Sequence, residues 1–158
     1  MLKNNTKAPE FRLSTVYEQQ LSIQELNGKN IVLVFYPAQE SVYSDELTLF
    51  NDAIKVFEEN NTVILGISID SRYNQITFTQ KMNLQFTLLS DFEPKGAVSK
   101  LYDVYDPING CSKRAIYLID NNGVIRWSYL PPEEAEPGPK LALDALDELI
   151  SCFNSNWY

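Results

Sequence analysis

Histidine is absent from the sequence, and cysteine occurs only twice, as Cys111 and Cys152. Without histidine, the chain cannot use Ser-His or Cys-His catalytic pairs, and most transition-metal sites are excluded. Two cysteines without a Cys-x-x-Cys motif do not make a disulfide framework. A glycine-rich phosphate loop is also missing. We therefore expect neither a metal nor a cofactor.

An excess of basic residues and long apolar runs are missing as well. The formal net charge is −8 and the pI is near 4.5. No cluster of Lys or Arg offsets this charge, which argues against nucleic acid or an anionic membrane as a partner. No apolar run approaches the roughly 18 residues of a spanning helix, and residues 1–10 are polar, unlike a signal peptide. We therefore expect a cytoplasmic protein that binds neither membranes nor nucleic acid.

The composition and one short run of residues indicate a globular α/β protein. Hydrophobic residues make up 44% of the chain and charged residues 22%, which predicts a single folded domain over 1–158. Residues 31–36 are apolar or aromatic and rich in β-branched types. This run predicts a strand buried on both faces, which ends at Pro37 because proline cannot donate to the sheet.

A helix is predicted to follow this strand over 43–59, with Ser41 or Ser44 as its N-cap. Asp45 and Glu46 suit the positive end of the helix dipole. A buried strand, a proline turn and a helix N-terminus together direct backbone N–H groups at one small polar side chain. The apolar stripe of this helix consists of Tyr43, Leu47, Phe50, Ile54 and Phe57.

Strands and helices alternate along the rest of the chain. Short extended segments are expected at 11–13 and 17–21, and a helical turn with a capping-box pattern at 22–26. Further strands are predicted at 62–69, 86–89, 115–119 and 124–129, the last two joined by a hairpin turn at 120–123. Further helices are predicted at 72–82, 95–102 and 141–153, with loops at 106–110 and 131–139. This order predicts an α/β fold with a mixed central sheet flanked by helices.

The junction between the first long strand and its helix resembles the active-site loop of the peroxiredoxins, the AhpC/TSA family. These proteins carry a Pro-x-x-x-Thr/Ser-x-x-Cys motif at this position. Pro37 matches the proline and Ser41 the Thr/Ser, while Ser44 stands where the peroxidatic cysteine should be. Aligned from the downstream residues 44–47, the loop is one residue short and Tyr43 takes the cysteine's place. In either alignment the position lacks a thiol.

The resemblance covers nearly the whole chain and implies a thioredoxin-like fold with an N-terminal extension. The monothiol, AhpE-like subgroup is the most similar, because no resolving cysteine closely follows Ser44. Thr87 is a small departure, since the family more often has proline there. The similar pieces occur in the family's order: Ala8-Pro9-Glu10-Phe11, Leu65-Gly66-Ile67-Ser68-Ile69-Asp70-Ser71, Leu88-Leu89-Ser90-Asp91, Lys113-Arg114-Ala115-Ile116-Tyr117-Leu118-Ile119-Asp120 and Gly123-Val124-Ile125.

The resemblance also implies roles for individual residues. In the family, the cysteine thiolate attacks the peroxide O–O bond and becomes a sulfenic acid, which a second thiol later reduces. Ser41 would hydrogen-bond the peroxide, Pro37 would screen the loop from water, and Arg114 would hold the anion and polarise the O–O bond. A hydroxyl at Ser44 cannot replace the thiol, because alcohols barely ionise near neutrality and cannot be oxidised and reduced in this cycle. Taken alone, Ser44 would be a helix N-cap and Arg114 a solvated charge.

Three interpretations of the site remain open. In the first, the peroxidase centre is lost and the scaffold survives as a binding or interaction protein, with a peroxide or a small anion as its ligand. In the second, the chain reduces hydrogen or alkyl peroxides through Cys111, which lies three residues before Arg114. Cys152, on an amphipathic helix, is expected to be a packing residue. In the third, Ser44 is an engineered replacement of a native cysteine, although the shortened loop favours natural divergence.

A homodimer is also expected from the resemblance, through the face beside the active-site loop. Tyrosine suits such a face because it buries a large area at low entropic cost and keeps a polar tip. The net charge of −8 per chain opposes self-association. The tyrosines expected at this end of the sheet are Tyr43, Tyr73, Tyr102 and Tyr105.

Overall fold

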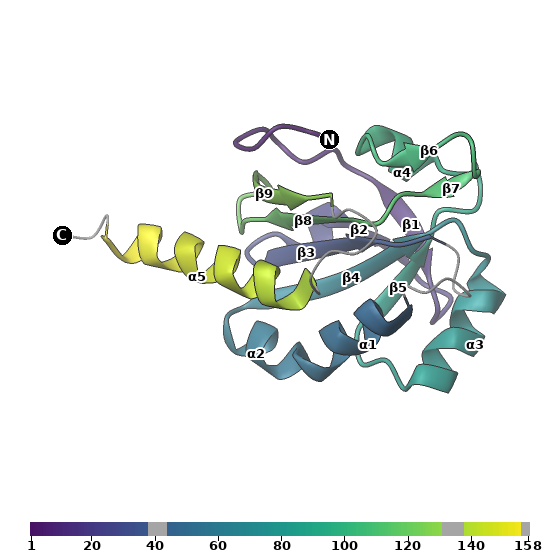
Figure 1. Ribbon diagram of the computed structural model, residues 1–158, viewed down its shortest axis with the longest axis horizontal. Helices are drawn as coiled ribbons and strands as arrows, with labels where there is room; N and C mark the ends of the chain where they lie inside the picture. The colour runs from purple at the N-terminus through teal and green to yellow at the C-terminus, as the bar shows by residue number, and fades with distance from the viewer. Residues whose placement is uncertain (38–43, 131–137, 156–158) are drawn as a thin grey trace.

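The protein is an α/β structure whose strands and helices alternate along the chain (Figure 1). The computed structural model describes residues 1–37, 44–130 and 138–155. Its main strands are β1 (Arg12–Thr15), β2 (Gln20–Ser22), β3 (Asn30–Phe35), β4 (Thr62–Ser68), β5 (Thr87–Ser90), β8 (Ala115–Ile119) and β9 (Ile125–Tyr129). Its helices are the 3-10 helix η1 (Ile23–Leu26), α1 (Ser44–Asp52), α2 (Ile54–Glu59), α3 (Arg72–Met82), α4 (Ala97–Leu101) and α5 (Gly138–Ser155).

These strands form one mixed sheet with β3 near its centre. The order of the strands is β2-β1-β5-β4-β3-β8-β9. Strand β3 pairs in parallel with β4 and antiparallel with β8. Strands β8 and β9 form the predicted hairpin, whose turn is held by the Asp120 carboxylate accepting the N–H groups of Asn122 and Val124. The mixed sheet of the thioredoxin-like fold is therefore confirmed.

Apolar layers lie on both faces of the sheet. In Figure 1, α1, α2, α3 and α5 lie below the sheet, and the N-terminal segment and α4 lie above it. Side chains of β3 alternate between the two layers, with Leu33 and Phe35 on the α4 side and Val32 and Val34 on the side of the longer helices. All four are fully or almost fully buried. The uninterrupted apolar run at 31–36 is therefore explained by burial on both faces.

The helix predicted over 43–59 is interrupted at Ala53, which separates α1 from α2. The Ala53 N–H is shared between the carbonyls of Leu49 and Phe50, each at 3.2 Å. The spacing of hydrogen bonds thus changes from four residues to three at this point, as in a turn of 3-10 helix. The apolar stripe still holds on both sides of the break, because Leu47, Phe50 and Phe57 are all buried.

Two local features differ from the prediction between η1 and β8. The side chain of Ser22 makes no capping hydrogen bond at η1, so the expected capping box is wrong. The expected loop at 106–110 is the turn of a small hairpin between β6 (Tyr105–Asp106) and β7 (Cys111–Ser112). The Asp106 carboxylate accepts the N–H groups of Ile108 and Asn109 in this turn. Strands of two residues are too short to show an alternating pattern in the sequence.

The predicted interface tyrosines do not share one environment. Tyr102 is fully buried among the aromatic rings of the α4-side layer, and its hydroxyl donates to the carbonyl of Pro9 at 2.7 Å. Its assignment to a dimer face is therefore wrong. Tyr105 is half-buried beneath the Lys100 ammonium, which lies 4.7 Å from the ring centre. Tyr73 is exposed, and Tyr43 lies outside the described residues.

Candidate active site at the end of strand β3

The candidate site lies where β3 ends and β8 begins. Phe35, the last residue of β3, is opposite Ala115, the first residue of β8. Because the two strands are antiparallel, Arg114 comes to lie beside Tyr36, next to Pro37. Tyr36 continues the pairing with β4 by donating its N–H to the carbonyl of Ile67 at 3.1 Å. Residues from distant parts of the sequence therefore meet at this edge of the sheet.

Arg114 is largely buried and forms an ion pair with Glu46, the third residue of α1. The Arg114 Nε donates to Glu46 Oε2, and the two side chains are 10% and 6% exposed. The alternative of a solvated surface charge at Arg114 is therefore wrong. A buried ion pair costs several kcal/mol of desolvation per charge, which its geometry and hydrogen bonds must offset. Its position at the end of β3 makes it the main electrostatic feature of the described site.

The N-terminal end of α5 closes the site on the other side of Glu46. A Cβ placed on Gly138, the first residue of α5, would collide with Glu46 Oε1 and with the Cδ1 atom of Ile116. A larger residue at this position would force one or both of these side-chain ends to move, because α5 approaches the ion pair and β8 closely. The positive end of this helix dipole is thereby brought to the Glu46 carboxylate.

The predicted loop residues are only partly described. Pro37 is half-buried and follows the end of β3, where the sequence predicts that the strand stops. Ser44 is the first residue of α1, at the strand-to-helix junction, although its side chain lies outside the described part. Ser41 and Tyr43 lie outside the described residues. The roles assigned to Pro37, Ser41, Ser44 and Arg114 stay predictions.

Tyr36 anchors the start of this junction in the core. The residue is 2% exposed, and burial raises the pKa of its phenol, an effect that the side chains of Ser68 and Gln75 partly offset. Gln75 reaches the same region from α3 and donates to Ser68 Oγ at 3.0 Å and to the Leu89 carbonyl at 2.8 Å. Gln75 thereby ties the end of β4 to β5 beside Tyr36.

Cys111, the alternative thiol, lies in a setting that does not activate it. It is a half-buried residue of the short strand β7. Burial raises the pKa of its thiol, and the nearby Asp106 carboxylate raises it further, while Lys95 acts in the opposite direction. A peroxidatic cysteine needs the reverse, because the thiolate is the nucleophile.

Cys152 lies far along α5 from the candidate site. At 1.5 Å per residue, it is about 21 Å from Gly138 along the helix axis. Its side chain is exposed, so the expectation that it packs in the core is wrong. The helix turns this position outward, whereas Ala142 and Leu146 are buried against the sheet.

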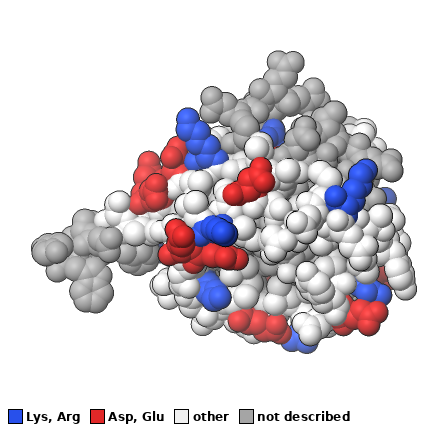
Figure 2. All heavy atoms as spheres, turned by 90° about the horizontal axis from the view of Figure 1, so that it is seen from below, with Lys and Arg blue, Asp and Glu red and all other residues white. Residues whose placement is uncertain are grey.

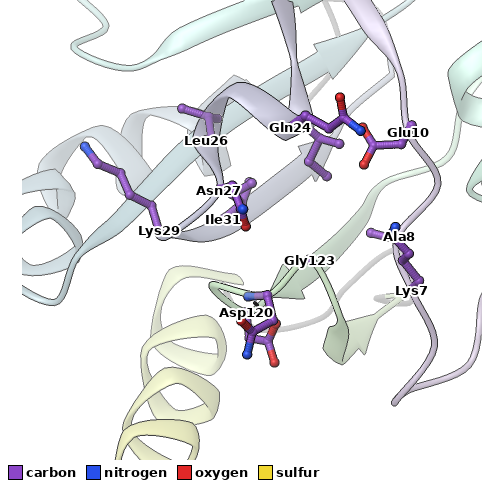
Figure 3. A pocket seen from close by; sticks show the side chains of 12 residues that line it. Lys7, Ala8, Glu10, Gln24, Leu26, Asn27, Lys29, Ile31, Asp120 and Gly123 are labelled. Atoms are coloured by element: carbon purple, nitrogen blue, oxygen red, sulfur yellow. Dashed lines mark hydrogen bonds between the residues drawn. The ribbon is translucent and has the colours of Figure 1, made fainter.

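A separate hollow of about 290 Å³ lies at the opposite end of β3 (Figure 3). It is lined by η1, the β8–β9 turn and the N-terminal segment. Lys29 points away from it, and Glu10 and Gln24 lie close together on one side. The buried Asp120 uses both carboxylate oxygens, in the β8–β9 turn and in an ion pair with Arg126. The charged side chains around this hollow are of both signs, and the buried one, Asp120, stabilises the β8–β9 hairpin.

The expectation that the protein binds neither nucleic acid nor membranes can be compared with its surface charge and its described helices. On the face in Figure 2, blue and red side chains are interspersed in small groups, without a broad basic area among the coloured residues. Within the described ranges, no helix has the length and apolar character to span a membrane. In the part of the chain that the structure describes, no group of three or more Cys, Asp or Glu side chains lies close enough together to hold a metal ion.

The matches to known proteins agree with this fold. The AhpC/TSA family matches residues 5–128, which is most of the chain. This chain belongs to the AhpC/TSA, or peroxiredoxin, family.

Several members of the family cover nearly all of this peroxiredoxin-family chain. Alkyl hydroperoxide reductase E of Mycobacterium tuberculosis is 31% identical over 153 residues, which cover 96% of this chain and 100% of that protein. The reduced 2-Cys peroxiredoxin of Plasmodium vivax has a TM-score of 0.86 at 26% identity, covering 96% of this chain and 83% of that one. The mitochondrial 2-Cys peroxiredoxin of Plasmodium falciparum has a TM-score of 0.83 at 28% identity, covering 98% of both chains.

Two residues at the site of this peroxiredoxin-family protein were not predicted as functional. Glu46 was expected only to complement the helix dipole, because its partner Arg114 is 68 residues away. Gly138 lies at a helix start between two prolines, where the sequence gives no reason for glycine. Both become significant only when α1, β8 and α5 are brought together.

Proposed function

We propose that this peroxiredoxin-family protein no longer carries out thiol peroxidase chemistry and that its site serves binding. By its likeness to the family motif, Ser44 takes the place of the peroxidatic cysteine at the start of α1. The position of the two thiols supports this proposal most directly. Cys111 is on β7 with a raised thiol pKa, and Cys152 is about 21 Å along α5 from the site.

The chemistry of the reaction explains why the missing thiol abolishes it. A thiolate attacks one peroxide oxygen, an S–O bond forms, and the O–O bond breaks as hydroxide or alkoxide leaves and takes up a proton. The resulting sulfenic acid is then reduced by a second thiol. A serine hydroxyl has no comparable oxidised state, so it can hold a peroxide but cannot turn it over. The remaining groups, including Pro37 and Arg114, can then contribute only to binding a small ligand such as a peroxide or an anion.

A peroxide-consumption assay tests the loss of activity. The purified protein is mixed with hydrogen peroxide or an alkyl hydroperoxide, with dithiothreitol or thioredoxin as reductant. The matched control is the Cys111→Ala, Cys152→Ala double variant, which contains no thiol. We expect the same slow consumption from both proteins. Turnover well above that of the control would overturn the proposal and favour Cys111 as a relocated nucleophile, which a Cys111→Ala single variant would identify.

A further inference from the structure

The Glu46 carboxylate lies where several positive groups converge. It is in the first turn of α1, its Oε2 accepts from Arg114 Nε, and its other oxygen faces the first residue of α5. Helix N-termini carry a partial positive charge and favour anions. Together with the guanidinium, these helix ends make an environment suited to a carboxylate or another small anion.

The second carboxylate oxygen gives independent evidence that this environment is a binding site. Among the residues that the structure describes, Glu46 Oε1 has no hydrogen-bond partner although the side chain is 94% buried. It is directed at the start of the 18-residue helix α5, where Gly138 leaves room for it. A buried anionic oxygen is normally satisfied by donors. The helix end and the Arg114 guanidinium are the positive groups beside this carboxylate.

We propose that Glu46 is the built-in anion of this site and determines which ligands the site accepts. The carboxylate occupies the anion position formed by Arg114 and the N-terminal ends of α1 and α5. An external small anion is excluded while Glu46 is in place, and a monocarboxylate binds once the Glu46 carboxylate is removed. This inference deepens the proposed function, because it selects an uncharged ligand over an anionic one for the intact site.

Replacing Glu46 with alanine tests the proposal by chemical rescue. The substitution removes a group of the size and charge of acetate, so added acetate should bind in its place and stabilise the folded state. We expect sodium acetate to raise the Tm of Glu46→Ala by at least about 3 °C, and that of the wild type by less than about 1 °C, relative to sodium chloride at the same ionic strength. Acetamide, the uncharged analogue of acetate, should have no such effect on either protein.

Glu46→Gln is the matched control, because it removes the charge but still fills the space. Acetate should not stabilise this variant selectively. Equal stabilisation of the wild type and Glu46→Ala, equal effects of acetate and acetamide, or no effect on Glu46→Ala would each overturn the proposal. If Glu46→Ala is unfolded in plain buffer, the same comparison is made by its refolding yield, and recovery with acetate but not acetamide is the expected result.

The rescue experiment can fail independently of the proposed function. Acetate binding is measured by stability and involves no peroxide or reductant. Peroxidase turnover in the wild type would overturn the loss of activity whatever acetate does. A failed rescue alongside an inactive wild type would overturn only the role of Glu46.

Discussion

Individual side chains at this site depend strongly on partners that are remote in the sequence. Glu46 and Arg114 compensate each other's charge in a setting where either charge alone would be costly. Gly138 matters for the side chain it lacks, because it lets α5 approach Glu46 and Ile116. The chemistry available at the site therefore follows from this buried pair together with the residue at position 44.

Ser44→Cys should create a thiol with a lowered pKa. The variant is made in a Cys111→Ala, Cys152→Ala background, so that only the new thiol titrates. The first turn of α1 and the Arg114 guanidinium both favour a thiolate, while the nearby Glu46 charge limits the effect. We expect a pKa below the free value of about 8.5, measured by the ultraviolet absorbance of the thiolate. The same thiol in denaturant is the control, and a folded value at or above it would contradict the prediction.

Arg114→Leu should destabilise the fold by about 3–5 kcal/mol, because it leaves the Glu46 charge buried without its cation. Urea unfolding measures the loss. Arg12→Leu is the matched control, since the Arg12 side chain is 64% exposed and lies 4.0 Å from Glu25; a change below about 1 kcal/mol is expected there. Adding Glu46→Leu to Arg114→Leu should recover much of the stability. If the double variant loses as much stability as the Arg114→Leu and Glu46→Leu single variants lose in sum, the two side chains are not coupled.

At the level of secondary structure elements, short helices rely on residues outside themselves. Helix α4 has five residues, too few to be stable alone. The Asp91 carboxylate, which follows β5, accepts the N–H groups of Val98 and Ser99 at 3.0 and 2.9 Å. It thereby supplies the cap that α4 lacks in its own sequence. Helix α5 differs, since it is long and amphipathic and its N-terminal end completes the candidate site.

The stability contributed by Asp91 should depend on pH in an unusual direction. Burial raises the pKa of Asp91 despite its hydrogen bonds to Val98 and Ser99. Between the unfolded value of about 3.9 and the raised folded pKa, the folded state binds more protons at this group than the unfolded state. The stabilisation from this group is therefore complete below the unfolded pKa and is lost as pH rises through the folded pKa.

Asp91→Asn isolates this effect, because the variant keeps every other titrating group. We expect the difference in unfolding free energy, wild type minus variant, to be most favourable to the wild type at the lowest pH. It should decline as pH rises through the window and then level off. Urea unfolding at a series of pH values measures the difference. A difference that stays constant, or that grows with pH, would show that Asp91 does not have a raised pKa.

At the scale of the whole molecule, one exposed aromatic area remains a candidate for self-association. Tyr73 is 72% exposed and Phe92 is 50% exposed, and both line a surface hollow of about 510 Å³ together with Arg12 and Arg72. This hollow lies near the ends of β1 and β5 and the start of α3. Of the tyrosines predicted for a dimer face, Tyr73 lines this exposed area together with Phe92, whereas Tyr102 is buried.

The dimer should form at micromolar concentration and become stronger with salt, because screening reduces the repulsion between chains of net charge −8. Sedimentation at two salt concentrations measures it. Tyr73→Ser should weaken the dimer, whereas Val56→Ser on α2, another exposed apolar position, should not. A monomer at both salt concentrations, or equal effects of the two substitutions, would contradict the prediction.

The sequence by itself determined the features that depend on neighbouring residues. The apolar run at 31–36 became β3, the helical stretch at 72–82 became α3, and the turn at 120–123 joined β8 to β9. The predictions of β3 and of the hairpin turn succeeded because burial on both faces and turn chemistry are recorded within a few consecutive residues. The lack of a thiol at residues 37–47 was likewise evident without a structure.

Only the tertiary structure decided which distant residues meet. The Glu46–Arg114 pair, the close approach of Gly138 to Glu46 and the burial of Tyr102 depend on contacts between α1, β8, α5 and the N-terminal segment. The same holds for Cys152, whose helical stripe suggested packing but whose place on α5 leaves it exposed. Local periodicity shows that a residue lies on the apolar face of a helix, but the arrangement of the elements decides whether that part of the face is covered.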